Sequence, residues 1–116
     1  MKFKPLTEAD VEFTIECLPE DVPVRGNAMA SGDPEVDKET EDYILDQLER
    51  GNEWAWCCVR VAAHWENFHG DDYLWGCSYA SEEEFCQPGG YFEHMKRAAL
   101  DDLNTQIEST AAQWDA

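Results

Sequence analysis

The sequence predicts an α+β domain in which an antiparallel sheet carries helices packed on one face. Three observations support this fold class. One segment alternates apolar and polar residues like a half-buried strand, and two later segments have the composition of a β-hairpin. Two further segments carry apolar residues at helical spacing between start and stop signals. The 116 residues, 43% of them hydrophobic, suffice for one core, so we expect residues 1–116 to form a single acidic α+β domain.

The first predicted strand covers residues 11–17, VEFTIEC, in which every second residue is apolar. A loop rich in Pro and Gly follows. Asp33 and Pro34 then have the chemistry of a helix N-cap and of the first helical residue. We expect this helix to end at Arg50, because Gly51 suits the left-handed position just beyond a helix.

Two more strands are predicted to form a hairpin. Aromatic, Val and Cys residues predominate from Glu53 to Trp65, and no helix breaker interrupts them. Residues 67–71, NFHGD, have turn composition, and residues 72–80, DYLWGCSYA, form the returning strand. This prediction places Asp71 and Asp72 at the hairpin turn.

The C-terminal part is predicted to be helical. Ser81 and Glu84 have the spacing of a capping box, which predicts a short helical turn that Pro-Gly-Gly at 88–90 then breaks. A last helix is expected over residues 91–112. Its inner stripe consists of Phe92, Met95, Ala99, Leu103, Ile107 and Thr110.

The chain is strongly acidic, with 26 Asp and Glu against 8 Lys and Arg and a net charge of −18. Net charge bears on solubility and partners rather than on fold. Affinity for a phosphate backbone comes from Lys and Arg, so we expect no direct nucleic-acid binding. The charge instead suits a protein that presents carboxylates to a basic surface that normally holds nucleic acid.

The first predicted helix places five carboxylates on one face, which we name the acidic stripe. They are 4, 3, 4 and 3 residues apart, which aligns them at about 3.6 residues per turn. Each step rises about 4.5–6 Å, the same scale as phosphates along a nucleic-acid strand. The stripe consists of Glu35, Glu39, Asp42, Asp46 and Glu49, and Asp71 and Asp72 extend the acidic surface. The core-facing set is Val36, Thr40, Tyr43, Ile44 and Leu48. The alternative is a solvated face that only keeps the protein soluble.

The second predicted strand places two Trp residues on the same face as Arg60 and His64, which is the composition of a partly covered surface. Trp54 and Trp56 are therefore candidate contacts with a protein partner or a second copy of the chain, since Trp is enriched at interface hot spots. The alternative is that the first strand or the long loop covers both rings.

We expect no enzyme, no catalytic residue, no cofactor and no metal. The five cysteines are odd in number, lack a CxxC pair and are expected to be reduced and buried. No nucleophile elbow, phosphate-binding glycine loop or HExxH motif occurs. Two weaker hypotheses are a metal site built from Cys77, Cys86 and a histidine, and a thiol enzyme in which Cys86 acts with His94.

Three stretches together resemble small accessory proteins encoded by bacteriophages and other mobile elements. They are GNEWAW at 51–56, DYL with GCSY at 72–79, and PGGYF with Met95 at 88–95. The resemblance covers about residues 50–103 and implies an anti-defence role, because such genes include anti-CRISPR and anti-restriction proteins, many of them acidic. It transfers no functional residue to this chain.

Two hypotheses of function follow. The first is an inhibitor that binds a bacterial nucleic-acid-handling complex through the acidic stripe and blocks DNA binding. A CRISPR surveillance complex is the leading target and a restriction enzyme the next. The second is a non-enzymatic phage regulator or assembly adaptor that uses the Trp-rich hairpin face. No apolar run approaches the ~18 residues of a membrane span, and the N-terminus lacks the apolar core of a signal peptide. We therefore expect no membrane association and a location in the host cytoplasm.

Overall fold

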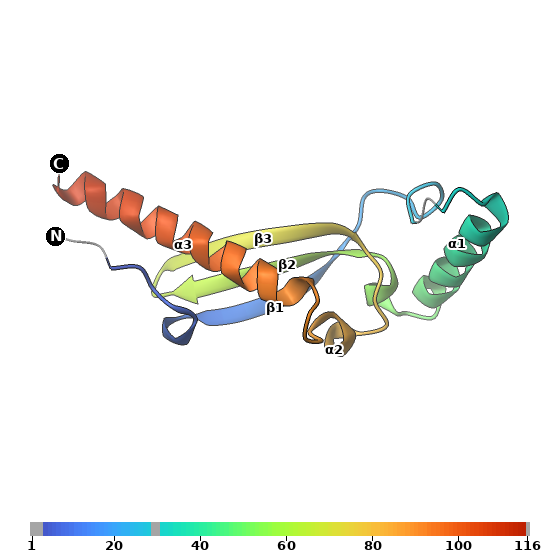
Figure 1. The fold of residues 1–116 in the computed structure, drawn as a ribbon, viewed down its shortest axis with the longest axis horizontal. Coiled ribbons are helices and arrows are strands. Elements are labelled where there is room, and N and C mark those ends of the chain that lie inside the picture. Colours follow the sequence, from blue (N-terminus) through green and yellow to red (C-terminus); the bar gives the residue numbers. More distant parts are fainter. Residues whose placement is uncertain (1–3, 29–30, 116) are drawn as a thin grey trace. The chain divides into compact units, whose positions relative to one another are not determined.

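The computed structural model describes residues 4–28 and 31–115, with side chains up to residue 111. The main elements follow one another as β1–α1–β2–β3–α2–α3 (Figure 1). Their bounds are β1 Glu12–Pro19, α1 Pro34–Glu49, β2 Cys57–Trp65, β3 Phe68–Cys77, α2 Glu82–Phe85 and α3 Tyr91–Asp115, with the 3-10 turns η1 Glu8–Asp10 and η2 Glu53–Ala55. Among the described residues the strands form an antiparallel sheet in the order β1-β2-β3, which confirms the α+β class.

The contacts divide the chain into two compact units. Unit 1 comprises Met1–Glu16, Arg60–Tyr73 and Pro88–Ala116, and unit 2 comprises Cys17–Val59 and Leu74–Gln87. Every strand contributes residues to both units, and the single domain expected from the sequence stays a prediction. Unit 2 carries 14 acidic and 3 basic residues, a net charge of −11, against 12 and 5, or −7, in unit 1. The larger share of the negative charge therefore lies in unit 2.

In unit 1, helix α3 lies across one face of the strands (Figure 1). Its buried side chains are Met95, Ala99, Leu100, Leu103 and Ile107. All of these except Leu100 belong to the predicted inner stripe, which is confirmed at those four positions. The other two stripe residues, Phe92 and Thr110, are half-buried. The burial of Leu100 was not predicted, because Leu100 does not continue the i, i+4 spacing of the inner stripe. It lies beside Ala99 and widens the apolar face of α3.

Strand β3 and helix α3 approach each other closely at Gly70, within unit 1. A Cβ atom at this position would lie 2.8 Å from the Cα of Leu103, and still closer to the carbonyl oxygen of Ala99 and the backbone nitrogen of Leu103. All three neighbours are backbone atoms, which cannot rotate out of the way. Glycine is therefore required here by the contact between backbones.

The caps of helix α1 are as the sequence predicts. The Asp33 carboxylate accepts a hydrogen bond from the backbone N–H of Glu35 at 3.0 Å, and Pro34 occupies the first helical position. Gly51 has a φ of 92°, the left-handed conformation expected just beyond a helix. The helix ends one residue earlier than predicted, with Arg50 as its C-cap.

The predicted core-facing side of α1 is partly wrong. Val36 and Tyr43 are exposed, whereas Ile44 is buried. The other buried residue of α1 is Glu41, which the sequence analysis left outside both faces. The buried side of α1 is therefore shifted around the helix axis from the predicted side toward Glu41. The Glu41 carboxylate accepts hydrogen bonds from donors on the preceding loop. The helix packs mainly on η2.

The second strand starts later than predicted. Residues 53–55 form the 3-10 turn η2, and β2 begins at Cys57. The side-chain oxygen of Asn52 accepts a hydrogen bond from the backbone N–H of Trp54 at 3.2 Å. Such a local cap competes with strand pairing, which explains why the β-prone Trp54 is not in the sheet.

The hairpin turn is two residues long and lies earlier than predicted. Glu66 and Asn67 form it, Glu66 has a φ of 53°, and β3 starts at Phe68. Asp71 and Asp72 therefore lie inside β3, which ends at Cys77 instead of residue 80. The sequence did not reveal this turn because Glu is uncommon in the left-handed conformation.

Replacing Gly70 with Ala tests the close packing of β3 on α3. We expect the Gly70→Ala variant to lose about 2–4 kcal/mol of unfolding free energy, because backbone atoms must move apart. Urea unfolding followed by circular dichroism measures the loss. The matched control is Gly89→Ala, at a position with a φ of 83° and open space around it, which should cost only about 1 kcal/mol. Equal losses in the two variants would contradict the packing argument.

Candidate functional site

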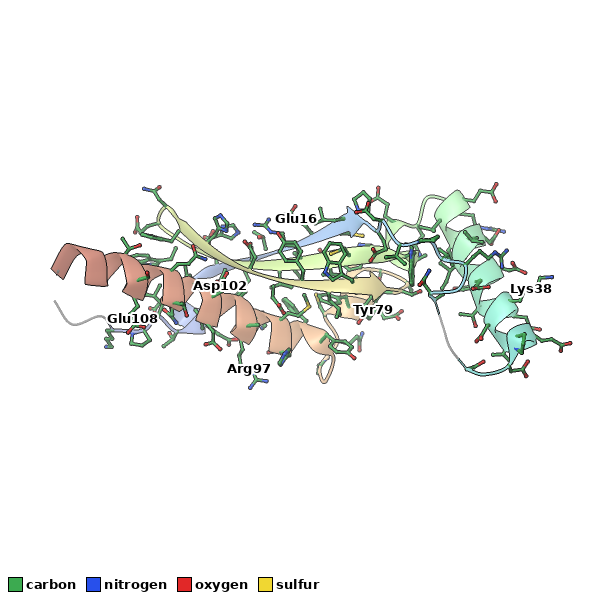
Figure 2. The ribbon with its side chains drawn as sticks, turned by 90° about the horizontal axis from the view of Figure 1, so that it is seen from above. Glu16, Lys38, Tyr79, Arg97, Asp102 and Glu108 are labelled. Atoms are coloured by element: carbon green, nitrogen blue, oxygen red, sulfur yellow. The ribbon has the colours of Figure 1, made fainter. Side chains whose placement is uncertain are left out.

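The acidic stripe predicted on α1 is exposed to solvent. Each of its five members is exposed, and they lie on the helix surface away from the buried Ile44. Lys38, the one basic residue in the sequence of α1, points outward as well (Figure 2). The stripe is formed by Glu35, Glu39, Asp42, Asp46 and Glu49, all within unit 2. The predicted geometry of a continuous carboxylate row is therefore present.

Two carboxylates in the middle of the stripe are paired with arginines of unit 2. Asp42 accepts from Arg25 at 2.5 Å, and Asp46 accepts from Arg50 at 2.8 Å. Both pairs are exposed to solvent, where an ion pair contributes at most about 1 kcal/mol. In the described part of the chain no ion pair forms at Glu35, Glu39 or Glu49. Within the described residues, arginine partners therefore lie at the centre of the stripe and not at its ends.

A buried carboxylate holds the preceding loop on α1. The Oε2 atom of Glu41 accepts from the backbone N–H of Gly26 at 2.5 Å, and its Oε1 atom accepts from Arg25 at 3.4 Å. Arg25 thus contacts both the buried Glu41 and the exposed Asp42. The burial of Glu41 was not expected from the sequence, and the available signal was its spacing of three residues from the apolar Ile44.

Of the two Trp residues proposed as partner contacts, Trp56 is buried and Trp54 is half-buried. Trp56 is 7% exposed, and its indole Nε1 donates to the carbonyl oxygen of Val22 at 2.7 Å. Trp54 is half-buried beside Tyr79 and Phe85, with ring centroids 6.5 and 5.7 Å away. The residues packed with Trp56 are Val24, Ile44 and Ala55, with Ala28 and Leu48 at the edge. The long loop covers Trp56, as the alternative expected, so Trp56 is a core residue and offers no exposed contact. A partner contact at the half-buried Trp54 stays a prediction.

Other aromatic side chains of unit 2 are exposed instead. Trp75 on β3 is 61% exposed, and Tyr43 on α1 is 63% exposed. Tyr43 was expected to face the core, and Trp75 was not among the expected contact residues. Alternation along β3 offered a signal, because Trp75 lies on the opposite face of the strand from Leu74 and Gly76.

Asp71 and Asp72 do not join the acidic stripe. They lie on β3 in unit 1 and are half-buried. The Asp71 carboxylate accepts from Arg60 at 2.5 Å and contacts the Nδ1 atom of His69 at 3.1 Å, while Arg60 also pairs with Glu16. Asp71 is thus engaged within its own unit. The expectation that Asp71 and Asp72 lie at the hairpin turn is wrong, because the turn lies at residues 66–67.

The five cysteines, all in the described ranges, form no disulfide. Three are buried as expected, whereas Cys17 and Cys86 are half-buried. Burial raises the pKa of the Cys17, Cys57 and Cys58 thiols, and it raises the pKa of Cys77 to about 11. A thiol with a raised pKa stays protonated at neutral pH, so none of these four is an activated nucleophile. Within residues 4–28 and 31–111, no group of three His, Cys, Asp or Glu side chains has the arrangement of a metal site.

Comparisons of the chain with protein-family models, with curated proteins and with solved structures gave no match. The resemblance to accessory proteins of mobile elements therefore stays a prediction. None of the helices in the described ranges has the length and apolar character needed to cross a membrane. The geometry of the acidic stripe is the basis for assigning a function.

The buried thiol of Cys77 predicts a loss of stability at alkaline pH. Its pKa is raised from 9.0 to about 11 in the folded protein. The unfolded chain therefore releases the proton first, and stability falls as the pH rises through this window. We expect the titration of the Cys77 thiol to lower the unfolding free energy by about 1–3 kcal/mol over this pH window.

Urea unfolding at a series of pH values from 8 to 11 measures this effect. The Cys77→Ala variant is the control, because it retains the titration of every other group. Its unfolding free energy should fall less steeply with pH than that of the unmodified protein. Parallel pH profiles for the two proteins would show that the Cys77 thiol does not titrate as described.

Proposed function

We propose that the protein binds a basic surface of another protein through the acidic stripe on α1. The supporting observation is that all five stripe carboxylates are exposed, on a helix of the unit that carries a net charge of −11. Complementary charge accelerates association and makes binding sensitive to salt. The three carboxylates without an arginine partner supply the strongest local charge.

The partner we propose is a nucleic-acid-handling complex of a bacterial host. A surface that holds a phosphate backbone presents rows of Lys and Arg, and the stripe repeats its charge at about 4.5–6 Å intervals along the helix. Occupying such a row would exclude DNA. In line with the resemblance to mobile-element accessory proteins, a CRISPR surveillance complex is the first candidate and a restriction enzyme the second, both in the host cytoplasm.

An adaptor function is the second candidate, and a different residue now supports it. Trp56 is buried and offers no exposed contact, but Trp75 is 61% exposed on β3. A large exposed aromatic side chain is a common anchor of protein interfaces. An adaptor that binds through Trp75 would keep its partner at high salt, which separates the two functions experimentally.

Neutralising the acidic stripe should abolish partner binding. The five carboxylates are replaced by the corresponding amides, and tagged protein is incubated with lysate of a bacterium that carries CRISPR and restriction systems. We expect the unmodified protein to retain a nucleic-acid-binding complex that salt releases and DNA displaces. The variant should bind that complex at least tenfold more weakly, because its contacts with Lys and Arg are removed.

The control replaces the same number of exposed carboxylates in unit 1 with amides. They are Glu8, Glu12, Glu93, Asp101 and Glu108. This control changes the net charge equally and should retain most of the binding, provided that circular dichroism shows both variants folded. Full binding by the stripe variant, or a salt-resistant partner lost with Trp75→Ala, would reject the stripe as the contact.

Releasing a paired stripe carboxylate should strengthen binding. In the Arg50→Gln variant, Asp46 loses its ion pair and becomes available to the partner. We expect a two- to fivefold lower dissociation constant at low salt, about the contribution of one exposed ion pair. The Lys38→Gln variant is the control because it removes the same charge from an exposed position of α1. An equal gain in the two variants would attribute the effect to net charge alone.

A further inference from the structure

Unit 2 contains a cavity of about 320 Å³ that lies beside the acidic helix. Its apolar walls are Leu18 and Pro19 at the end of β1, Leu48 on α1, and Trp56, which follows η2. The volume lies near the lower end of the range for small-molecule sites. The cavity is therefore large enough for one long side chain.

Two carboxylates also line the cavity, and none of its lining residues is basic. Glu20 is held in place because its Oε1 accepts from the Val22 N–H at 3.2 Å and its Oε2 accepts from the Gly76 N–H at 2.6 Å. A carboxylate has about four lone-pair sites, so Glu20 can accept further bonds. Glu53 is exposed, and no hydrogen bond to its side chain forms within the described ranges. The cavity thus combines apolar walls with one fixed and one adjustable negative group.

This combination selects a particular ligand chemistry. An anion would be repelled by Glu20 and Glu53, and a purely apolar ligand would leave both carboxylates without a new partner. An alkyl chain that ends in a guanidinium or ammonium group suits both the apolar walls and the carboxylates. Its stem packs on apolar surface, and its charged head stays near water and the carboxylates. The remaining polar group, the Cys17 thiol, is neutral because burial raises its pKa.

We propose that this cavity receives the side chain of an arginine or lysine of the partner protein. Its stem would pack between Leu18, Leu48 and Trp56, and its head would bind Glu20 and Glu53. Leu48 is adjacent to Glu49 of the acidic stripe, so one helix supplies both contacts. The origin of the side chain rests on the proposed function, whereas the chemistry of the cavity can be tested on the protein alone.

The test is a titration of ¹⁵N-labelled protein with n-butylguanidinium, followed through the indole N–H resonance of Trp56. We expect a saturable shift with a dissociation constant on the order of millimolar, in keeping with so small a ligand. n-Butanol provides the stem without the charge, and guanidinium provides the charge without the stem. At equal concentration and ionic strength, each should bind at least fivefold more weakly than n-butylguanidinium.

Two single substitutions locate the binding. Glu53→Gln should weaken n-butylguanidinium binding by about three- to tenfold, because one of the two charged contacts is lost. Glu83→Gln removes an exposed carboxylate of unit 2 that neither lines the cavity nor belongs to the stripe, and it should leave this binding unchanged. No shift at Trp56, equal binding of n-butanol, or equal effects of the two substitutions would overturn the proposed cavity chemistry.

The partner complex provides the second part of the test. Glu53→Gln should weaken capture of the complex several-fold if the ligand is one of its side chains. Full capture by this variant, together with n-butylguanidinium binding to the unmodified protein, would overturn the partner as the source of the side chain. The titration contains no partner protein, so its result does not depend on the stripe proposal. That proposal is tested by the capture experiment with the stripe variant.

Discussion

The buried carboxylate of Glu41 is the contact on which unit 2 depends. It accepts from Gly26 and Arg25 and so fixes the loop that precedes α1. The same loop supplies the carbonyl oxygen of Val22 to the Trp56 indole and the side chain of Val24 to the core. Removing these donors would leave a buried carboxylate without hydrogen-bond partners, which destabilises a folded protein. One carboxylate turned inward therefore orients the helix whose other carboxylates face solvent.

This arrangement gives the arginines of unit 2 two opposing effects. Arg25 and Arg50 lower the repulsion between stripe carboxylates at Asp42 and Asp46, which favours the folded helix. The same contacts reduce the charge that the stripe presents to a partner. Arg25 also contacts Glu41, so its position is set by the fold, whereas Arg50 makes an exposed pair at the helix end. Folding and the proposed partner binding thus draw on the same carboxylates.

Local signals in the sequence predicted much of this structure. The capping pattern of Asp33 and Pro34 predicts the start of α1, and helical spacing predicts the stripe and the buried face of α3, because both depend on neighbours a few residues away. The burial of Trp56 was not predictable in this way. It depends on a loop without periodicity that is held by Glu41, which is itself an unexpected buried acid. Similarly, Asp71 was misplaced because a left-handed Glu66 defines the turn.

The composition of the stripe itself argues against a purely solubilising face. Alternating Glu with Lys along the same helix would keep the protein soluble and would gain i, i+4 attraction. The sequence of α1 contains a single Lys among its acidic residues and instead accepts repulsion between neighbouring carboxylates. Long-range charge of this kind accelerates association but discriminates poorly between basic partners. The cavity beside Leu48 would add the short-range contact that recognises one side chain, because desolvated contacts in a shaped pocket are more selective than exposed charges.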